Sequence, residues 1–587
     1  MNKYKKFMYI GIFILLISLV SSAGTYAWFT WISPSNTSVT LSIGNLADVT
    51  FTSGPDINIS NLAPVYNYTD GVSTTFTVRN TNSTDSLLYK VKLEITSIAN
   101  ELKDETFKYT LVKDNKVVKT GNLKDAVNGN TLILNTSSLD KGSTSSPKIS
   151  TFKLYFWIDG NMENNSNMMN KSLVGKIDVG VETNVLTNAE SSISSTSKFL
   201  NTEVPRQNIK TLKYVDNLNI PEGATVVDVS KSGDNTIKMW YNEADANGNY
   251  DITIGSNNII YANPSGSNLF SNLTNVTSID LSNLDTSGIA GMNGMFENDK
   301  VLTNIVFGDN FNTSNATNMT AMFRECNNLT ELDLRMFDTS NVRNMGSMFL
   351  NCTKLESLDL SMFDTSNVMD MGGMFLNCTK LESLDLSSFD TSSITNFGKI
   401  FYHCTSLKSL NVSNFNTSNV TNFYDMFNGC SSLKELDVSG FDTSKAVIMG
   451  NMFSGCSSLE SLDVSHFNTS NVKTMSNMFS SLKCSLDLSN FDTSNVDNLS
   501  QMFMYYKNER LDLSSFDTSK VTSTNHMFAS SSIEYIDLRN ADFSNVTDYT
   551  NMFKGISKST IIYLKDTTGN RNFMNTNFNN ITATYIS

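Results

Sequence analysis

The stretch "FDTSNVMDMGGMFLNCTKLESLDLSSFDTSS", residues 363–393, begins and ends on nearly the same letters. It belongs to a longer series, because Met-Phe pairs stand at residues 295, 322, 348, 374, 426, 452, 478, 502, 527 and 552, and Ile400-Phe401 fills the one vacancy. The step is 26 residues through the middle and 24 to 27 elsewhere. A unit of this length cannot bury its own apolar face, so the period predicts a solenoid of about eleven coils that stack on one another.

Two periodicities alternate within each coil. Leu358 and Leu360 alternate with Ser357, Asp359 and Ser361, and this period of two predicts a short strand with leucines inward and polar residues outward. After the turn "FDTSN", apolar residues recur in steps of three and four, which predicts a short helix or a helical turn. The residues expected in the structural core include Met348, Phe349, Cys352, Met374, Phe375, Cys378, Met426, Phe427 and Cys430.

The repeat carries a family resemblance. The L-x-x-L-x-L core resembles leucine-rich repeats, and the longer phrase "LDLSSFDTSNVxNMxxMFxxCxxL", assembled from several copies, is similar to the BspA-like leucine-rich repeat of bacterial surface proteins. The similarity spans about residues 276–555. It implies an extracellular attachment or host-interaction protein.

The first residues predict export. Lys3, Lys5 and Lys6 precede an apolar run from Phe7 to about Val20, and small residues follow, as in a secretory signal with a cleavage site at Ala27. The alternative is an uncleaved membrane anchor, because the apolar run approaches the length of a spanning helix. In either case we expect the rest of the chain to be extracellular.

Composition divides the remaining chain. All seven prolines and all four tryptophans precede residue 265, and all seven cysteines follow residue 325. Before residue 186, period-two runs such as "TTFTVRN" and "FKLYFWID" predict an antiparallel β-sandwich. The expected organisation is multidomain and β-rich: signal peptide 1–27, β-sandwich 28–186, Ser/Thr-rich linker 187–207, N-terminal cap of the solenoid 208–275, repeats 276–560 and C-terminal cap 561–587.

A second resemblance lies near the signal. The motif "GTYAWFTW", residues 24–31, is similar to the start of camelysin and TasA-type biofilm-matrix proteins. That resemblance implies a β-sandwich that can assemble by strand exchange. Self-assembly through the N-terminal domain is therefore a second expectation.

Several chemistries are disfavoured by the composition. The 57 acidic residues outnumber the 43 basic ones and give a net charge of −14, which argues against a nucleic-acid partner. Six cysteines recur at 26-residue steps, so we expect a ladder of buried, reduced thiols, with bridging of neighbours as the alternative. The three histidines, His403, His466 and His526, belong to no catalytic motif, so we expect no enzyme activity.

The outward side of the predicted strands is the candidate ligand face. It repeats small polar and acidic residues and includes two columns of aspartates. Turn capping and solvation are the simplest explanations of these columns, and calcium binding is the alternative. No other cofactor is expected. The face candidates are Ser357, Asp359, Ser361, Ser383, Asp385, Ser387, Asn411, Asp437 and Asp463.

These expectations combine into a function. We expect a secreted, cell-surface binding or adhesion protein whose repeats present a polar face to a host or matrix protein or glycan. The alternative is a structural component of extracellular matrix or fibres that assemble through the N-terminal sandwich.

Overall fold

The computed structural model describes residues 37–41, 56–59, 64–80, 87–140, 142–143, 145–161, 166–169, 171–182, 184–187, 193–578 and 581–586. The predicted signal segment, its cleavage site at Ala27 and the motif at residues 24–31 lie outside these residues. The chain divides into two compact units, residues 1–182 and 183–587.

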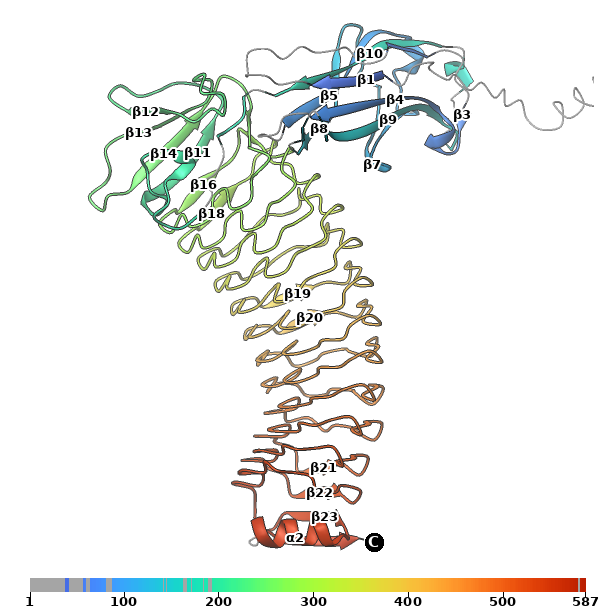
Figure 1. Ribbon diagram of the computed structural model, residues 1–587, viewed down its shortest axis with the longest axis vertical. Coiled ribbons are helices and arrows are strands. Elements are labelled where there is room, and N and C mark those ends of the chain that lie inside the picture. The colour runs from blue at the N-terminus through green and yellow to red at the C-terminus, as the bar shows by residue number, and fades with distance from the viewer. Residues whose placement is uncertain are drawn as a thin grey trace, which may run out of the picture. The chain divides into compact units, whose positions relative to one another are not determined.

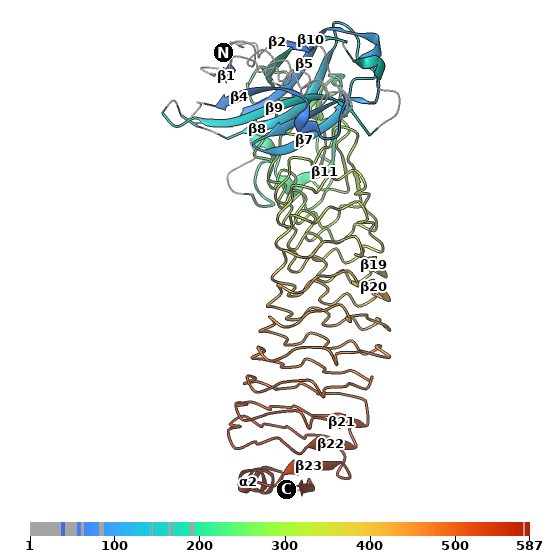
Figure 2. The same cartoon turned by 90° about the vertical axis from the view of Figure 1, so that its right-hand side faces the viewer.

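The described residues of the first unit form two β-sheets (Figure 2). One has the order β1-β4-β9-β6-β7 with β3 added on β9, and the other has the order β2-β10-β5-β8. The strands are β1 (Thr37–Leu41), β2 (Asp56–Ile59), β3 (Pro64–Val65), β4 (Val72–Asn80), β5 (Leu87–Ile98), β6 (Phe107–Lys113), β7 (Lys116–Asn122), β8 (Thr131–Leu139), β9 (Lys148–Asp159) and β10 (Leu173–Val181). The short 3-10 helices are η1 (Tyr68–Asp70), η2 (Asn100–Leu102) and η3 (Ser166–Met168).

In these strands, alternate side chains face the interior between the sheets, as the alternation in the sequence predicted. Phe76 on β4 and Phe152 on β9 point inward and stack with ring centroids 5.2 Å apart, and Val91 and Ile177 of the other sheet join the same core. The two sheets therefore share one hydrophobic interior. Pairing is antiparallel within them, except that β1 on β4 and β3 on β9 are parallel, which the sequence pattern did not predict.

The second unit opens with a small mixed sheet of order β12-β13-β14-β11-β16-β18. Within it, β13 pairs antiparallel with β14, and the turn at Asn247-Gly248 lies between these two strands in the sequence. Parallel pairing of β11 with β16, and of β16 with β18, carries the sheet into the first repeats. The strands here are β11 (Ile209–Val215), β12 (Thr225–Asp228), β13 (Lys238–Tyr241), β14 (Tyr250–Gly255), β15 (Ile260–Tyr261), β16 (Ser278–Asp280), β17 (Leu284–Asp285) and β18 (Asn304–Val306).

The predicted linker 187–207 is, in its later half, part of the packed second unit. Phe199, Leu200 and Val204 are buried in its core, around η4 (Phe199–Asn201). The guanidinium of Arg206, at the start of η5 (Arg206–Asn208), is buried and donates to the carbonyl oxygens of Leu269 (3.0 Å) and Ser271 (2.8 Å). The Ser/Thr-rich composition around residue 195 concealed these anchors.

The repeats follow one another in file from green to red (Figure 1). Single parallel bridges join equivalent residues of consecutive repeats, as in Asn318 to Asn344 and Asn344 to Asp370. The predicted strand at L-x-x-L-x-L is present in only some repeats, and its bounds are β19 (Ser383–Asp385), β20 (Ser409–Asn411), β21 (Arg510–Asp512) and β22 (Tyr535–Leu538). Leu358 and Leu384 are nevertheless buried as expected.

The helix predicted after the "FDTSN" turn is wrong for residues 276–560, all of which the structure describes. The residue before each Met-Phe pair and the second residue after it have positive φ angles, such as 55° at Ala321 and 61° at Glu325. Left-handed residues interrupt a right-handed helix. Steps of three and four arise instead from consecutive turns, in which Met322 N–H donates to the Met319 carbonyl (3.2 Å).

The same segment carries the ladder between repeats. Alternate amides donate to the next repeat: Ala321 to the Gly346 carbonyl (2.9 Å) and Phe323 to the Met348 carbonyl (2.9 Å). The pattern recurs from repeat to repeat, for example at Lys399, whose amide donates to the Tyr424 carbonyl (2.9 Å). The main hydrogen-bonded ladder therefore lies on the Met-Phe segment and not on the predicted strand.

The core residues named from the sequence are all buried. Met348, Phe349, Met374 and Phe375 have no exposed surface, and the phenylalanines of consecutive Met-Phe pairs stack, as Phe349 and Phe375 do at 5.7 Å with ring planes 8° apart. Offset parallel stacking is a favourable arrangement for aromatic rings. Identical side chains thus form continuous columns inside the repeats.

The chain ends in a cap. β23 (Ile561–Lys565) and β24 (Ala583–Ile586) continue the parallel sheet after β21 and β22, and α2 (Thr568–Asn577) lies between them in sequence. Thr567 caps α2 by accepting from the Asn570 amide (3.0 Å). The buried Asn570 side chain donates to the Ala541 carbonyl (2.8 Å) and accepts from the Phe543 amide (3.0 Å), so it satisfies backbone groups of the last repeat.

The threonine of "FDTSN" joins repeats and was missed from the sequence. Thr417 is 1% exposed, and its hydroxyl donates to the Asp442 carbonyl of the next repeat (2.9 Å). The same bond forms from Thr365 to Asp390 (3.0 Å). In the sequence this threonine is hidden between Asp and Ser, which are the usual capping residues of such a turn.

Thr417→Val should destabilise the repeats by about 1–2 kcal/mol, because it removes the buried hydroxyl that donates to the Asp442 carbonyl at nearly unchanged volume. Urea unfolding of the full chain would measure the change. Thr395→Val is the control: Thr395 is exposed, and Val447 already occupies its position two repeats later. Equal midpoints for the two variants would contradict this role of the buried threonine.

Candidate functional site

The polar face predicted from the sequence is exposed and in register. Ser357, Asp359, Ser361, Ser383, Asp385, Asp437 and Asp463 are exposed, and Ser387 and Asn411 are half-buried. Between β19 and β20, Ser383 faces Ser409 and Asp385 faces Asn411. We call these nine residues the polar face.

The aspartates of the polar face cap their own turns. The Asp359 carboxylate accepts from the Ser361 amide (3.0 Å), and Asp463 accepts from both the amide (3.0 Å) and the hydroxyl (2.7 Å) of Ser465. Hydrogen bonds from the serine side chain and amide two residues later lower the pKa of Asp359, Asp437 and Asp463 below its usual value. Solvation was the plain expectation for this column, with calcium as the alternative; the exposed carboxylates are in addition held by local capping bonds.

The second aspartate column is made of turn caps, as expected. Asp338 accepts from the Ser340 amide (3.0 Å) and Asp390 from the Ser392 amide (2.9 Å). Near the start of the repeats an arginine joins the first column, because Arg335 donates to Asp333 and lowers the pKa of that carboxyl to about 2. Among the described residues, no group of three or more His, Cys, Asp or Glu side chains is placed to hold a metal ion.

The cysteines form the expected ladder of free, buried thiols. Each of the six in register donates to the carbonyl of the Met-Phe phenylalanine one repeat back, as Cys378 does to Phe349 (3.2 Å) and Cys404 to Phe375 (3.1 Å). Burial raises the pKa of Cys404 to about 12. These thiols are interior hydrogen-bond donors, with poor access and little thiolate for chemistry.

The histidines stay separate from one another. His403 is exposed beside the buried Cys404, as the sequence indicated. The Nε2 atom of His466 lies 3.0 Å from the Val438 carbonyl oxygen, and His526 contacts Asn551. The structure does not bring these residues into one cluster.

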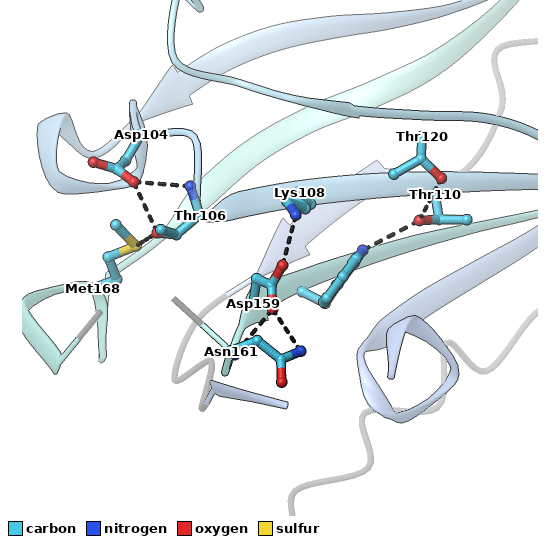
Figure 3. A network of polar contacts seen from close by, with 9 residues as sticks. Asp104, Thr106, Lys108, Thr110, Thr120, Asp159, Asn161 and Met168 are labelled. Atoms are coloured by element: carbon cyan, nitrogen blue, oxygen red, sulfur yellow. Dashed lines mark hydrogen bonds and ion pairs between the residues drawn. The ribbon is translucent and has the colours of Figure 1, made fainter. Parts of the chain in front are cut away.

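The first unit has a polar network of its own (Figure 3). Lys108 on β6 donates to Asp159 at the end of β9 (2.6 Å), and Asn161 donates to the same carboxylate from its amide (3.0 Å) and side chain (3.1 Å). Burial opposes ionisation of Asp159, but these bonds outweigh it and lower its pKa. Asp104 similarly accepts from Thr106 (2.8 Å), so the network anchors loops to strands.

Among the residues that the structure describes, no helix combines the length and the apolar character needed to cross a bilayer.

Native thiols should resist alkylation by iodoacetamide at pH 9, and all seven should react in concentrated urea. The folded pKa of Cys404, about 12, lies above its ordinary value of 9.0, so protonation stabilises the fold below pH 9 and this contribution is lost as pH rises toward 12. The unfolding midpoint should fall over that range, less steeply in Cys404→Ser. Rapid alkylation of the folded chain would contradict the buried ladder.

Comparison with known proteins identifies the repeats. The family model described as "Mycoplasma protein of unknown function, DUF285" matches residues 265–383, 330–433, 374–485 and 447–565, which together span just over half of the chain. No curated protein matches the sequence. The chain therefore belongs to the DUF285 family, with tandem copies of that family's repeat across its C-terminal half.

Proposed function

We propose that the chain is a secreted, cell-surface binding or adhesion protein. In this proposal the repeats are a solenoid of the BspA-like leucine-rich type, and the first unit is a β-sandwich that carries it. The polar face binds a host or matrix ligand, and no catalytic step or metal is involved.

One observation supports the proposal most directly: the exposed polar residues recur in register from one repeat to the next. The facing pairs Ser383 with Ser409 and Asp385 with Asn411 offer a hydroxyl and a carboxylate or amide oxygen at each step. A ligand with a repeating structure can bind such a surface through many weak contacts at once. Neither a buried cavity nor a single strong contact is then required.

The aspartates also fit this role. Each carboxylate is held by a hydrogen bond within its own turn, as Asp385 is by the Ser387 amide (3.0 Å). The column of carboxylates is therefore preorganised for a ligand. The net charge of −14 favours a basic patch on a protein partner over an anionic surface. A polyhydroxylated glycan remains compatible, because carboxylates and serine hydroxyls accept from sugar hydroxyls.

The second candidate is a structural component of extracellular matrix or fibres. The observation that favours it is that the described part of the first unit leaves sheet edges at β7 and β8, to which another strand could be added. The exposed Lys116 and Lys119 on β7 oppose it at that edge, because charged edge residues discourage strand pairing. We therefore rank binding through the polar face first.

The test replaces the serines of the polar-face column by lysine. The variant is Ser357→Lys with Ser383→Lys and Ser409→Lys, all exposed positions. Its control adds the same charge elsewhere on the repeats, as Met369→Lys with Thr395→Lys and Thr421→Lys, where Arg343 and Lys473 occupy equivalent positions. Binding of the labelled full chain to coats of basement-membrane extract and of mucin is the readout.

The polar-face variant should lose at least about tenfold in binding to the coat that retains the wild type, while the control variant keeps it. Equal binding of wild type and polar-face variant would refute the assignment of this face. If the unmodified chain also formed fibres in negative-stain electron microscopy, that result would favour the matrix-fibre candidate.

A further inference from the structure

One cluster of side chains departs from the repeat pattern on the Met-Phe segment. Lys399, Tyr402 and His403 come from one repeat, and Tyr424 and Asp425 come from the next. In the other repeats the position of Tyr424 is occupied by small or short polar residues, namely Asn293, Thr320, Gly346, Gly372, Gly398, Gly450, Ser476, Ser500, Asn525 and Thr550. Folding of the repeats therefore does not require a tyrosine at this position.

The cluster is compact. The Lys399 ammonium lies 5.8 Å from the ring centroid of Tyr402 and 5.8 Å from that of Tyr424, so it stands between two aromatic rings from consecutive repeats. The Tyr402 ring stacks on the His403 imidazole at 4.1 Å. Tyr424 is 37% exposed and the Lys399 side chain 49%, so both groups are accessible from solvent.

Glycines make room for these side chains. A Cβ atom added to Gly429 would come within 2.3 Å of His403 Cδ2, so the imidazole occupies space that only glycine leaves open. A Cβ atom at Gly450 would come within 3.3 Å of the Tyr424 ring. The repeats that flank Tyr424 carry Gly398 and Gly450 in its column, so no side chain of that column stands beside the phenol ring.

The buried carboxylate of Asp425 lies next to the Lys399 ammonium. Asp425 is 4% exposed and has a φ angle of 58°, a conformation that favours glycine or asparagine. Its carboxylate accepts from the Asn428 side chain (2.7 Å) and lies 4.0 Å from the Lys399 ammonium. Burial raises the pKa of Asp425, which is a cost that the neutral Asn451 and Asn477 of the following repeats avoid.

We propose that this cluster binds a carboxylated sugar within an extended glycan. The exposed Tyr424 face packs against the apolar face of the pyranose ring, and the Lys399 ammonium donates to the sugar carboxylate. His403 and Tyr402 form the adjoining wall. The site uses the Met-Phe segment rather than the polar face, so it stands independently of the binding surface proposed above.

The choice of a carboxylated sugar follows from the groups that are accessible. Lys399 presents charged donors to solvent, whereas the carboxylate of Asp425 is buried behind it. A charge-assisted bond from an ammonium to a carboxylate is stronger than a neutral one to a hydroxyl. A neutral sugar would gain only the ring contact and uncharged hydrogen bonds.

Saturation-transfer NMR titrations of the full chain test the proposal. The probes are sialyllactose and trigalacturonate, with lactose and the methyl ester of trigalacturonate as their uncharged counterparts. At least one carboxylated probe should bind, and its uncharged counterpart should bind about tenfold more weakly, because the charged hydrogen bond is lost. Tyr424→Gly should weaken binding of the carboxylated probe by a similar factor.

Two further variants complete the experiment. Lys399→Asn with Asp425→Asn removes the charged pair while copying asparagines found in other repeats, and it should also abolish the preference for the carboxylated probe. Tyr505→Ser removes another exposed tyrosine, at a position that is serine in both flanking repeats, and should leave binding unchanged. Absence of binding by either carboxylated probe, equal binding of the uncharged ones, or unchanged binding by Tyr424→Gly would overturn the proposal.

Discussion

The structure of the second unit depends on hydrogen bonds between equivalent residues of consecutive repeats. Amides such as Ala321 and Phe323 donate to the next repeat, Thr417 adds a buried hydroxyl, and Cys404 donates back to the preceding repeat. A single repeat can bury too little apolar surface to fold alone, and it needs neighbouring repeats to stack on it. The hydrogen bonds between repeats fix the register in which the leucine, methionine and phenylalanine columns become continuous. Any surface that the repeats present inherits that register.

This constraint separates what folding needs from what it does not. Positions in the core vary little in chemical character, since even the vacancy at Ile400 is filled by an apolar residue that is fully buried. The ladder joins backbone atoms, so residues as different as Ala321 and Lys399 can carry it. Exposed positions are free to vary, so an unusual side chain there is informative. The regular polar face and the Tyr402, Tyr424 and Lys399 cluster are the two ways in which this chain uses that freedom: one repeats a group many times, and the other breaks the pattern once.

The sequence predicted the columns well and the backbone less well. Periodicity located the buried Met348, Phe349 and Cys352 because a period reports which side of the chain faces inward. It could not distinguish a helix from consecutive turns, since both place apolar residues three and four apart. The residues with left-handed backbone conformation, such as Asn351 and Asn377, would have distinguished turns from a helix. Asparagine and glycine are frequent at these positions, and residues in this conformation end a helix. The later half of the linker was not predicted to be packed, because Phe199 and Arg206 are isolated anchors in a polar stretch. The aromatic cluster does not show in the periodicity, because a period reports only what the repeats share.

Hydrogen–deuterium exchange of the full chain, read by mass spectrometry on peptides from each repeat, tests the ladder most directly. Peptides that contain the Met-Phe segment, such as residues 319–326, should exchange slowly in every repeat. This protection should extend to repeats whose L-x-x-L-x-L segment forms no strand, because the alternate amides of the Met-Phe segment are bonded to the next repeat. Slow exchange confined to the segments of β19 to β22, with fast exchange at the Met-Phe segments, would contradict the account.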